Sequence, residues 1–164
     1  MSSAIRGPML PVLLAGVLSA CSGLPPLWGD DTPRAITVQQ IAGTSDCGMA
    51  ADKASLLVFA EAEGLLRWAE SNDRPHLAKN RVAGKRHAVV AMDAEAGGLA
   101  VAREAVKRGD YLMLHVSRLS GDPEARGASA CAVVVLPEEL SGRARIDARD
   151  PEGALLTSWP PAAE

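Results

Sequence analysis

Residues 131–136 read Cys-Ala-Val-Val-Val-Leu, and Pro137 follows them. Six consecutive apolar residues predict a strand that is buried on both faces, because a strand with one face in water alternates apolar and polar side chains. Proline lacks a backbone N–H and therefore ends the strand. The run predicts the central strand of a buried sheet.

Further strands are predicted from short apolar stretches bounded by glycine, proline and polar residues. They cover residues 36–41, 55–59, 87–92, 111–116 and 143–148. Residues 99–106 fit a helix by propensity or a strand by alternation. The strand is favoured because Lys107-Arg108-Gly109-Asp110 resembles a hairpin turn, in which Gly109 can adopt a positive φ.

One amphipathic helix is predicted over residues 61–71, because apolar and charged side chains separate there onto two sides at helical spacing. The apolar side consists of Leu65, Leu66, Trp68 and Ala69. Asn72, Asp73 and Pro75 end the helix. The predicted fold class is α+β, with a mainly antiparallel β-sheet and one helix.

The first 20 residues have the form of a bacterial export signal. Arg6 supplies one positive charge, and residues 8–17 are an apolar stretch too short to span a bilayer, because ten helical residues rise only about 15 Å. Leu18-Ser19-Ala20-Cys21 resembles the lipobox of bacterial lipoproteins. The resemblance implies cleavage between Ala20 and Cys21, a diacylglycerol thioether on Cys21, and a fatty acid such as palmitate on its new amino group. The alternative is an ordinary secretory signal followed by a chance cysteine.

Lipidation of Cys21 would hold the mature chain on a membrane, since several acyl chains together form a stable anchor. Ser22 follows the cysteine in place of aspartate, which by the sorting rule of such lipoproteins implies the outer membrane, on the side of the periplasm. Residues 21–35 are rich in proline, glycine and aspartate and read as a flexible tether. The globular domain is expected over residues 36–156, and a Pro-rich tail over residues 157–164.

The charge balance argues against nucleic acid as a partner. Removal of residues 1–20 takes away one basic residue and no acidic one, which leaves 16 basic and 20 acidic side chains and a net charge of −4. Aromatic residues make up only 3% of the chain, so stacking platforms for bases or sugars are not expected.

Cys47 and Cys131 remain once Cys21 is assigned to lipid. Two thiols in an oxidising compartment predict one disulfide, and the alternative is a pair of unconnected buried thiols. Closure of a loop of about 85 residues would stabilise the domain by about 4.6 kcal/mol in the chain-entropy model. A redox role is not expected, because no Cys-x-x-Cys pair is present.

The order of features from Cys47 to Asp150 resembles the C-terminal domain of the PrcB family, bacterial exported proteins named as subunits of a protease complex. The matching features are Cys47-Gly48, Leu65-Leu66-Arg67-Trp68, the stretch from Val89 to Val101 around Gly97-Gly98, and the run from Cys131 to Pro137. Residues 93–99 keep the two glycines of the family's middle turn but lack its Pro-Thr and its Tyr. The resemblance implies a non-catalytic accessory subunit.

Other motifs have ordinary structural explanations. His76, His87 and His115 match no metal-ligand spacing, so no metal site is predicted. Ser45 lies in a glycine-rich turn and lacks the Gly-x-Ser-x-Gly elbow of a serine hydrolase. Arg108-Gly109-Asp110 spells a tripeptide that integrins bind, but these are common turn residues.

The expected function is therefore a membrane-anchored, exported interaction or accessory module that binds another exported protein, for instance a protease. No catalytic residue and no cofactor is expected, since the sequence contains no catalytic, phosphate-binding or dinucleotide-binding motif. Two alternatives stay open: a structural lipoprotein of the cell envelope, and a small envelope enzyme with an unrecognised site.

Overall fold

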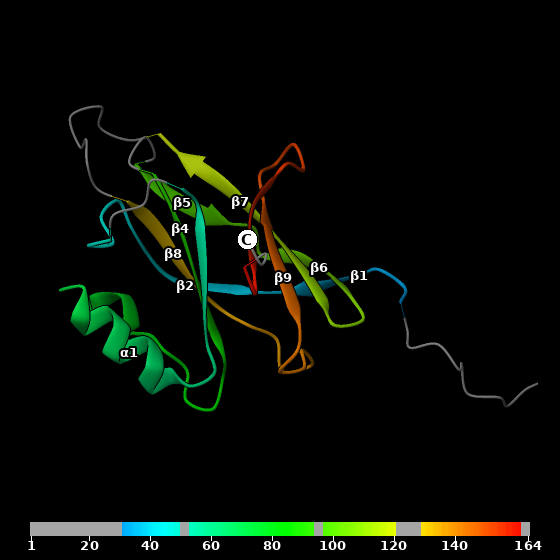
Figure 1. Cartoon of the computed structure of the whole chain (residues 1–164), viewed down its shortest axis with the longest axis horizontal. Coiled ribbons are helices and arrows are strands. Elements are labelled where there is room, and N and C mark those ends of the chain that lie inside the picture. The colour runs from blue at the N-terminus through cyan, green and yellow to red at the C-terminus, as the bar shows by residue number, and fades with distance from the viewer. Residues whose placement is uncertain (1–30, 50–52, 94–96, 121–128, 162–164) are drawn as a thin grey trace, which may run out of the picture.

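A computed structural model describes residues 31–49, 53–93, 97–120 and 129–161. The predicted signal, the cleavage site at Ala20 and Cys21, and most of the predicted tether lie outside the described residues. The elements, in chain order, are β1 (Arg34–Thr37), β2 (Gln39–Thr44), β3 (Ser55–Phe59), α1 (Ala62–Ser71), a 3-10 helix η1 (Pro75–Ala78), β4 (His87–Met92), β5 (Gly98–Val101), β6 (Glu104–Arg108), β7 (Tyr111–Leu119), β8 (Ala130–Val135), β9 (Arg145–Arg149) and β10 (Leu155–Trp159). The α+β class is confirmed (Figure 1).

A four-stranded antiparallel sheet, here called the small sheet, has the order β2-β8-β4-β3. The run at 131–136 supplies most of β8, which is hydrogen-bonded to β2 on one side and β4 on the other. Its side chains alternate between two cores: Ala132 and Val134 belong to one cluster of buried side chains, and Cys131 and Val133 to another. Burial of both faces explains why this strand shows no polar alternation.

The second of these clusters is the layer between the small sheet and the helices. Leu65 and Ala69 of α1 and Leu77 of η1 are fully buried in it, against Val89 of β4 and Val133 of β8. The helical stripe predicted from residues 61–71 therefore covers the outer face of the small sheet (Figure 1).

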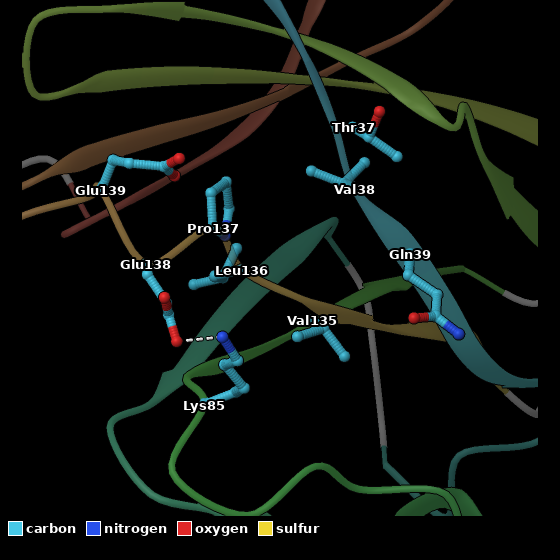
Figure 2. Close-up of a pocket in the computed structure, with 9 residues that line it drawn as sticks. All are labelled: Thr37, Val38, Gln39, Lys85, Val135, Leu136, Pro137, Glu138 and Glu139. Atoms are coloured by element: carbon cyan, nitrogen blue, oxygen red, sulfur yellow. Dashed lines mark hydrogen bonds and ion pairs between the residues drawn. The ribbon is translucent and has the colours of Figure 1, made fainter.

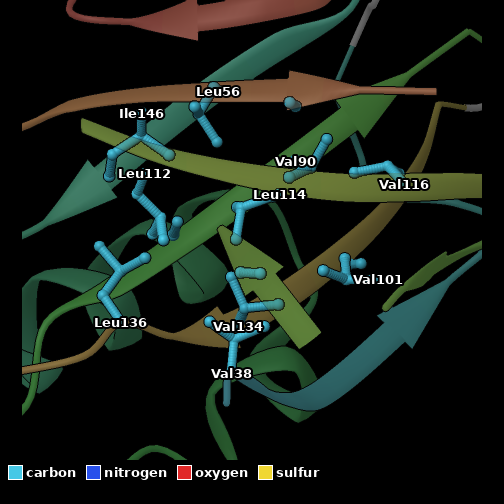
Figure 3. Close-up of a cluster of buried hydrophobic side chains, with 14 of the residues drawn as sticks. Val38, Leu56, Val90, Val101, Leu112, Leu114, Val116, Val134, Leu136 and Ile146 are labelled. Carbon is cyan, nitrogen blue, oxygen red and sulfur yellow. The ribbon is translucent and has the colours of Figure 1, made fainter. Parts of the chain in front are cut away.

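The remaining strands form a large sheet with the order β1-β6-β7-β9-β10, and β5 also pairs with β7. β7 and β9 run parallel, which the sequence pattern did not predict, while the other pairs are antiparallel. The inner faces of the two sheets meet in the larger cluster, where Leu112 and Leu114 of β7 and Ile146 of β9 lie opposite Val90 and Val134 of the small sheet (Figure 3).

β1 and β2 connect the two sheets at one corner, where the strand pair β5 and β6 of the large sheet is also interrupted. The stretch predicted as one strand over 36–41 is divided at Val38, with β1 in the large sheet and β2 in the small one. The stretch over 99–106 is strand, as favoured, but is divided at Ala102 and Arg103 into β5 and β6. The Val38 N–H donates to the Arg103 carbonyl at 2.8 Å, so both interruptions lie at the same point. The Gln40 side chain stabilises the corner by accepting from the Val101 N–H at 2.8 Å and donating to the Leu99 carbonyl at 3.1 Å.

Two expected boundaries differ from the structure. β1 begins at Arg34, inside the segment 21–35 expected as tether, and pairs with β6. β10 continues to Trp159, inside the segment 157–164 expected as tail, and pairs with β9. β1 is stabilised by a strand far along the chain, and local composition does not reveal such a partner. β10 instead pairs with the strand that directly precedes it.

The predicted disulfide is confirmed: Cys47 and Cys131 are bonded, with their Cα atoms 5.9 Å apart and a sequence separation of 84. Both cysteines are fully buried beneath the helices. The disulfide ties the turn after β2 to the central strand β8.

Candidate functional site

The outer face of the large sheet is the candidate site, here called the open face. Both described helices lie on the far side of the molecule, against the small sheet (Figure 1). Along β7, Leu112 and Leu114 point into the core, so Tyr111, Met113 and His115 point outward and are partly exposed. The open face thus carries aromatic, polar and apolar side chains that the described elements leave accessible.

A buried carboxylate organises this face. The Asp147 side chain on β9 is only 2% exposed, although its two strand neighbours, Ile146 and Ala148, point into the core. Asp147 Oδ2 accepts from the Tyr111 hydroxyl at 2.8 Å and from Arg149 Nη2 at 3.2 Å, and Oδ1 accepts from Arg145 Nε at 3.1 Å. Three donors therefore surround and shield one negative charge.

Strand register aligns two guanidinium groups on either side of Tyr111. Arg108 of β6 is paired with Tyr111 of β7, and Tyr111 is paired with Arg145 of β9. The three side chains form one row across neighbouring strands, here called the Arg-Tyr-Arg row. The next row contains Val106, Met113 and Asp147, so apolar and hydrogen-bonded groups adjoin the cations.

Burial and the hydrogen bond to Asp147 raise the pKa of the Tyr111 hydroxyl above its ordinary value. Both effects favour the neutral hydroxyl, since ionisation would place a second negative charge beside the carboxylate. Tyr111 therefore acts as a donor that helps to hold Asp147 in place.

The turn around Cys47 is a second polar cluster, on the covered side of the molecule. Asp46 accepts from the Gly48 N–H at 2.8 Å and forms an ion pair with Arg74, whose Nε also donates to the Asp46 carbonyl at 3.0 Å. The Gly48 hydrogen bond and Arg74 lower the pKa of the Asp46 carboxyl. Gly48 has φ +71°, and a Cβ there would clash with the carbonyl of Asn72 at the end of α1. These contacts assign the residues around Ser45 to a structural turn.

The three histidines are distributed over different layers. His76 is exposed in η1, His87 is fully buried on β4, and His115 lies on the open face. The His87 Nε2 accepts from the Val82 N–H at 3.1 Å, and burial lowers the pKa of His87 although the Lys85 backbone partly offsets it. Within the described ranges, no three His, Cys, Asp or Glu side chains are grouped so as to hold a metal ion.

Two hollows flank the corner at Val38. One, of about 350 Å³, lies beside the end of β8 and contains an ion pair between Lys85 and Glu138 (Figure 2). The other, of about 470 Å³, includes Gln40 and Arg103. Both hollows share Thr37, Val38 and Gln39 among their lining residues.

Sequence reasoning missed the Asp147 cluster, although a trace of it is visible. Arg145, Asp147 and Arg149 alternate at strand spacing, which places three charged side chains on one face of β9. The partner Tyr111 is 36 residues away, and no local sequence signal connects it to Asp147.

The hairpin between β6 and β7 was predicted correctly, and Gly109 in its turn has φ +54°.

No helix in the described part of the chain has the length and apolar character that crossing a membrane requires. Comparisons with protein-family models, with curated proteins and with solved structures found no match to this chain.

Proposed function

We propose that this chain is an exported lipoprotein, anchored through Cys21 to the outer membrane, that binds another exported protein through the open face and acts as its non-catalytic accessory module. The observation that carries the proposal is the open face itself: Tyr111, Met113 and two arginines lie together on a sheet surface that neither helix covers. Tyrosine, methionine and arginine are enriched in the cores of protein interfaces. The resemblance to the PrcB family favours a protease as the partner.

The anchor is tested by Cys21→Ala in the full chain. The wild type is expected in the membrane fraction with incorporated palmitate, and the variant is expected to lose the label and remain uncleaved at Ala20. Equal labelling of both proteins would contradict the anchor.

The interface is tested with a photoreactive residue placed at position 113 of the full-length lipoprotein in its native envelope. A matched control carries the same residue at position 67, on the exposed side of α1. The proposal expects one exported protein to be crosslinked from position 113 across growth conditions and not from position 67. The purified partner must then bind the purified lipoprotein. Equal crosslinking from both positions, or none from position 113, contradicts the proposal.

A further inference from the structure

β1 is an edge strand with backbone hydrogen-bonding groups that no described strand uses. It pairs with β6 on one side only. The Val38 N–H donates to the Arg103 carbonyl, directly before β6. Backbone groups alternate between the two sides of a strand, so Ala35 and Thr37 direct their N–H and C=O groups away from β6. Such a free edge is a template for pairing with another strand.

Pro137 explains why this side of β1 is unpaired. β8 pairs with β2 from Gln39 onward, where Gln39 lies opposite Val135. Continued at the same register, β8 would place Pro137 opposite Thr37, and proline has no N–H to donate. β8 ends at Val135 instead, and the hollow of about 350 Å³ lies between Thr37 and the residues that follow β8.

The hollow carries carboxylates, and β1 carries an exposed arginine. Glu138 and Glu139 line the hollow on the side away from β1 (Figure 2). Glu138 forms an ion pair with Lys85, and the neighbouring Arg86 donates to two loop carbonyls. Glu139 and Arg34 are both exposed, and neither has a hydrogen bond or ion pair with another described residue. The hollow adjoins the last residue of β1 and Arg34 is the first, about 10 Å away along the strand.

We propose that two copies of this chain form a dimer by pairing their β1 strands, antiparallel and centred on Ile36. Ala35 of each copy then lies opposite Thr37 of the other, and the two residues exchange both of their backbone hydrogen bonds. The contact is isologous, because a two-fold axis maps each β1 onto the other. The axis is perpendicular to the sheet, so the two large sheets join with their open faces on the same side.

The register of this pair matches both the charges and the length of the free edge. Arg34 of the second copy lies opposite Val38, at the hollow, where its guanidinium donates to Glu139. The free edge ends there, because β8 takes the position beside Gln39. β1 of the second copy ends at the same point, since Pro33 precedes its first residue. Each β1 therefore fits the length of edge that the other leaves free.

Cysteine crosslinking tests the pairing on the purified full-length protein in detergent. In the dimer the two Ile36 residues form a non-hydrogen-bonded pair with Cα atoms about 4.5 Å apart, a separation that a disulfide bridges. Ile36→Cys is therefore expected to give a covalent dimer on mild oxidation, since Cys47 and Cys131 are already bonded. Wild type, oxidised in the same way, accounts for any crosslink through Cys21. Ser158→Cys, on the edge strand β10, is the matched control and is expected to stay monomeric.

Charge reversal tests the same register without a new thiol. Sedimentation equilibrium in density-matched detergent is expected to show a wild-type dimer, with a dissociation constant that rises at least about tenfold in Arg34→Glu and in Glu139→Arg. The variant that carries both substitutions restores opposite charges and is expected to return toward wild type. Arg67→Glu, on the exposed side of α1, is the matched control and is expected to dimerise as wild type does.

The proposal is overturned if the wild type is monomeric at every concentration, or if Ile36→Cys and Ser158→Cys crosslink equally. Self-association that Arg34→Glu leaves unchanged would assign the contact to another surface, and would overturn it as well. Crosslinking of an exported partner from position 113 is a separate result, because Met113 lies on β7 and not on the edge strand.

Discussion

The outer faces of the two sheets differ in the side chains that they carry and in whether a described helix packs on them. The small sheet is closed by α1 and η1, and its outer side chains join the disulfide in a dry layer that contains Leu65 and Val133. Neither described helix covers the outer face of the large sheet, where a buried carboxylate, Asp147, accepts hydrogen bonds from tyrosine and arginine side chains. Apolar burial stabilises the first face, and a network of charged hydrogen bonds organises the second.

The contrast separates the part of the molecule that is held by apolar packing from the part that we propose binds a partner. A layer of packed apolar side chains resists change because every group has lost its water. Guanidinium groups at a sheet surface keep part of their hydration, which is weaker than that of an ammonium group.

Loss of the disulfide should have the largest effect, and it acts on the covered face. Replacing Cys47 and Cys131 together by alanine is expected to lower the free energy of unfolding by about 4 to 5 kcal/mol, because the loop between them is long. Urea denaturation measures the change, and dithiothreitol should destabilise the wild type but not the double variant. Hydrogen exchange should rise more in α1 than in β9, and a uniform rise would contradict the separation of the two faces.

Asp147→Asn should have the next largest effect, and it acts on the open face. The asparagine NH2 group would face an arginine donor and could not accept its hydrogen bond. The variant is therefore expected to lose about 2 kcal/mol of stability. Hydrogen exchange should then rise in β7 and β9 and remain unchanged in α1. A variant as stable as wild type would show that the network contributes nothing to the fold.

Tyr111 reports on the same network, because it is the only tyrosine in the chain. Titration of tyrosinate absorbance near 295 nm is expected to show a pKa above the ordinary value of 10.0, owing first to burial and then to the hydrogen bond to Asp147. In Asp147→Asn the pKa should fall but stay elevated, since burial remains. Because the folded pKa is raised, the wild type should lose stability as the pH rises above 10.

His87 should make the covered face sensitive to acid. Its pKa is lowered by burial, so the unfolded chain binds the proton more readily, and stability should fall as the pH decreases below 6.5 toward the folded pKa. Denaturation midpoints at pH 7.5 and 5.0 measure this loss. His87→Gln should show a smaller difference between the two midpoints, and an equal difference would assign the acid sensitivity to another group.

Asp46→Asn should have the smallest effect, although it also removes a carboxylate that is paired with arginine. The Asp46 side chain is 44% exposed, so its ion pair with Arg74 is screened by water, and the loss of stability is expected to stay below about 1 kcal/mol. A loss of stability as large as that of Asp147→Asn would mean that burial does not determine how much each carboxylate contributes to the free energy of unfolding.

The covered face was largely predictable, because its signals are local. The stripe from Leu65 to Ala69, the strand at 87–92 and the apolar run at 131–136 each indicate burial through spacing or composition alone. The open face was not, because its cluster joins Tyr111 to residues of β9 through a parallel pairing that no turn specifies. The division of the predicted strand at Val38 was missed for the same reason, since its cause is the Arg103 carbonyl.

The sequence by itself indicated most of the strands and the position of the helix, and it predicted that Cys47 and Cys131 are paired. The strands and the helix follow from the spacing of apolar residues, and the disulfide was predicted from the two cysteines that remain when Cys21 is set aside. Only the tertiary structure decided which sheet face the helix covers and which face no described helix covers. That choice depends on the order in which strands pair, and strand order brings Arg108, Tyr111 and Arg145 into one row although 37 residues separate the first from the last.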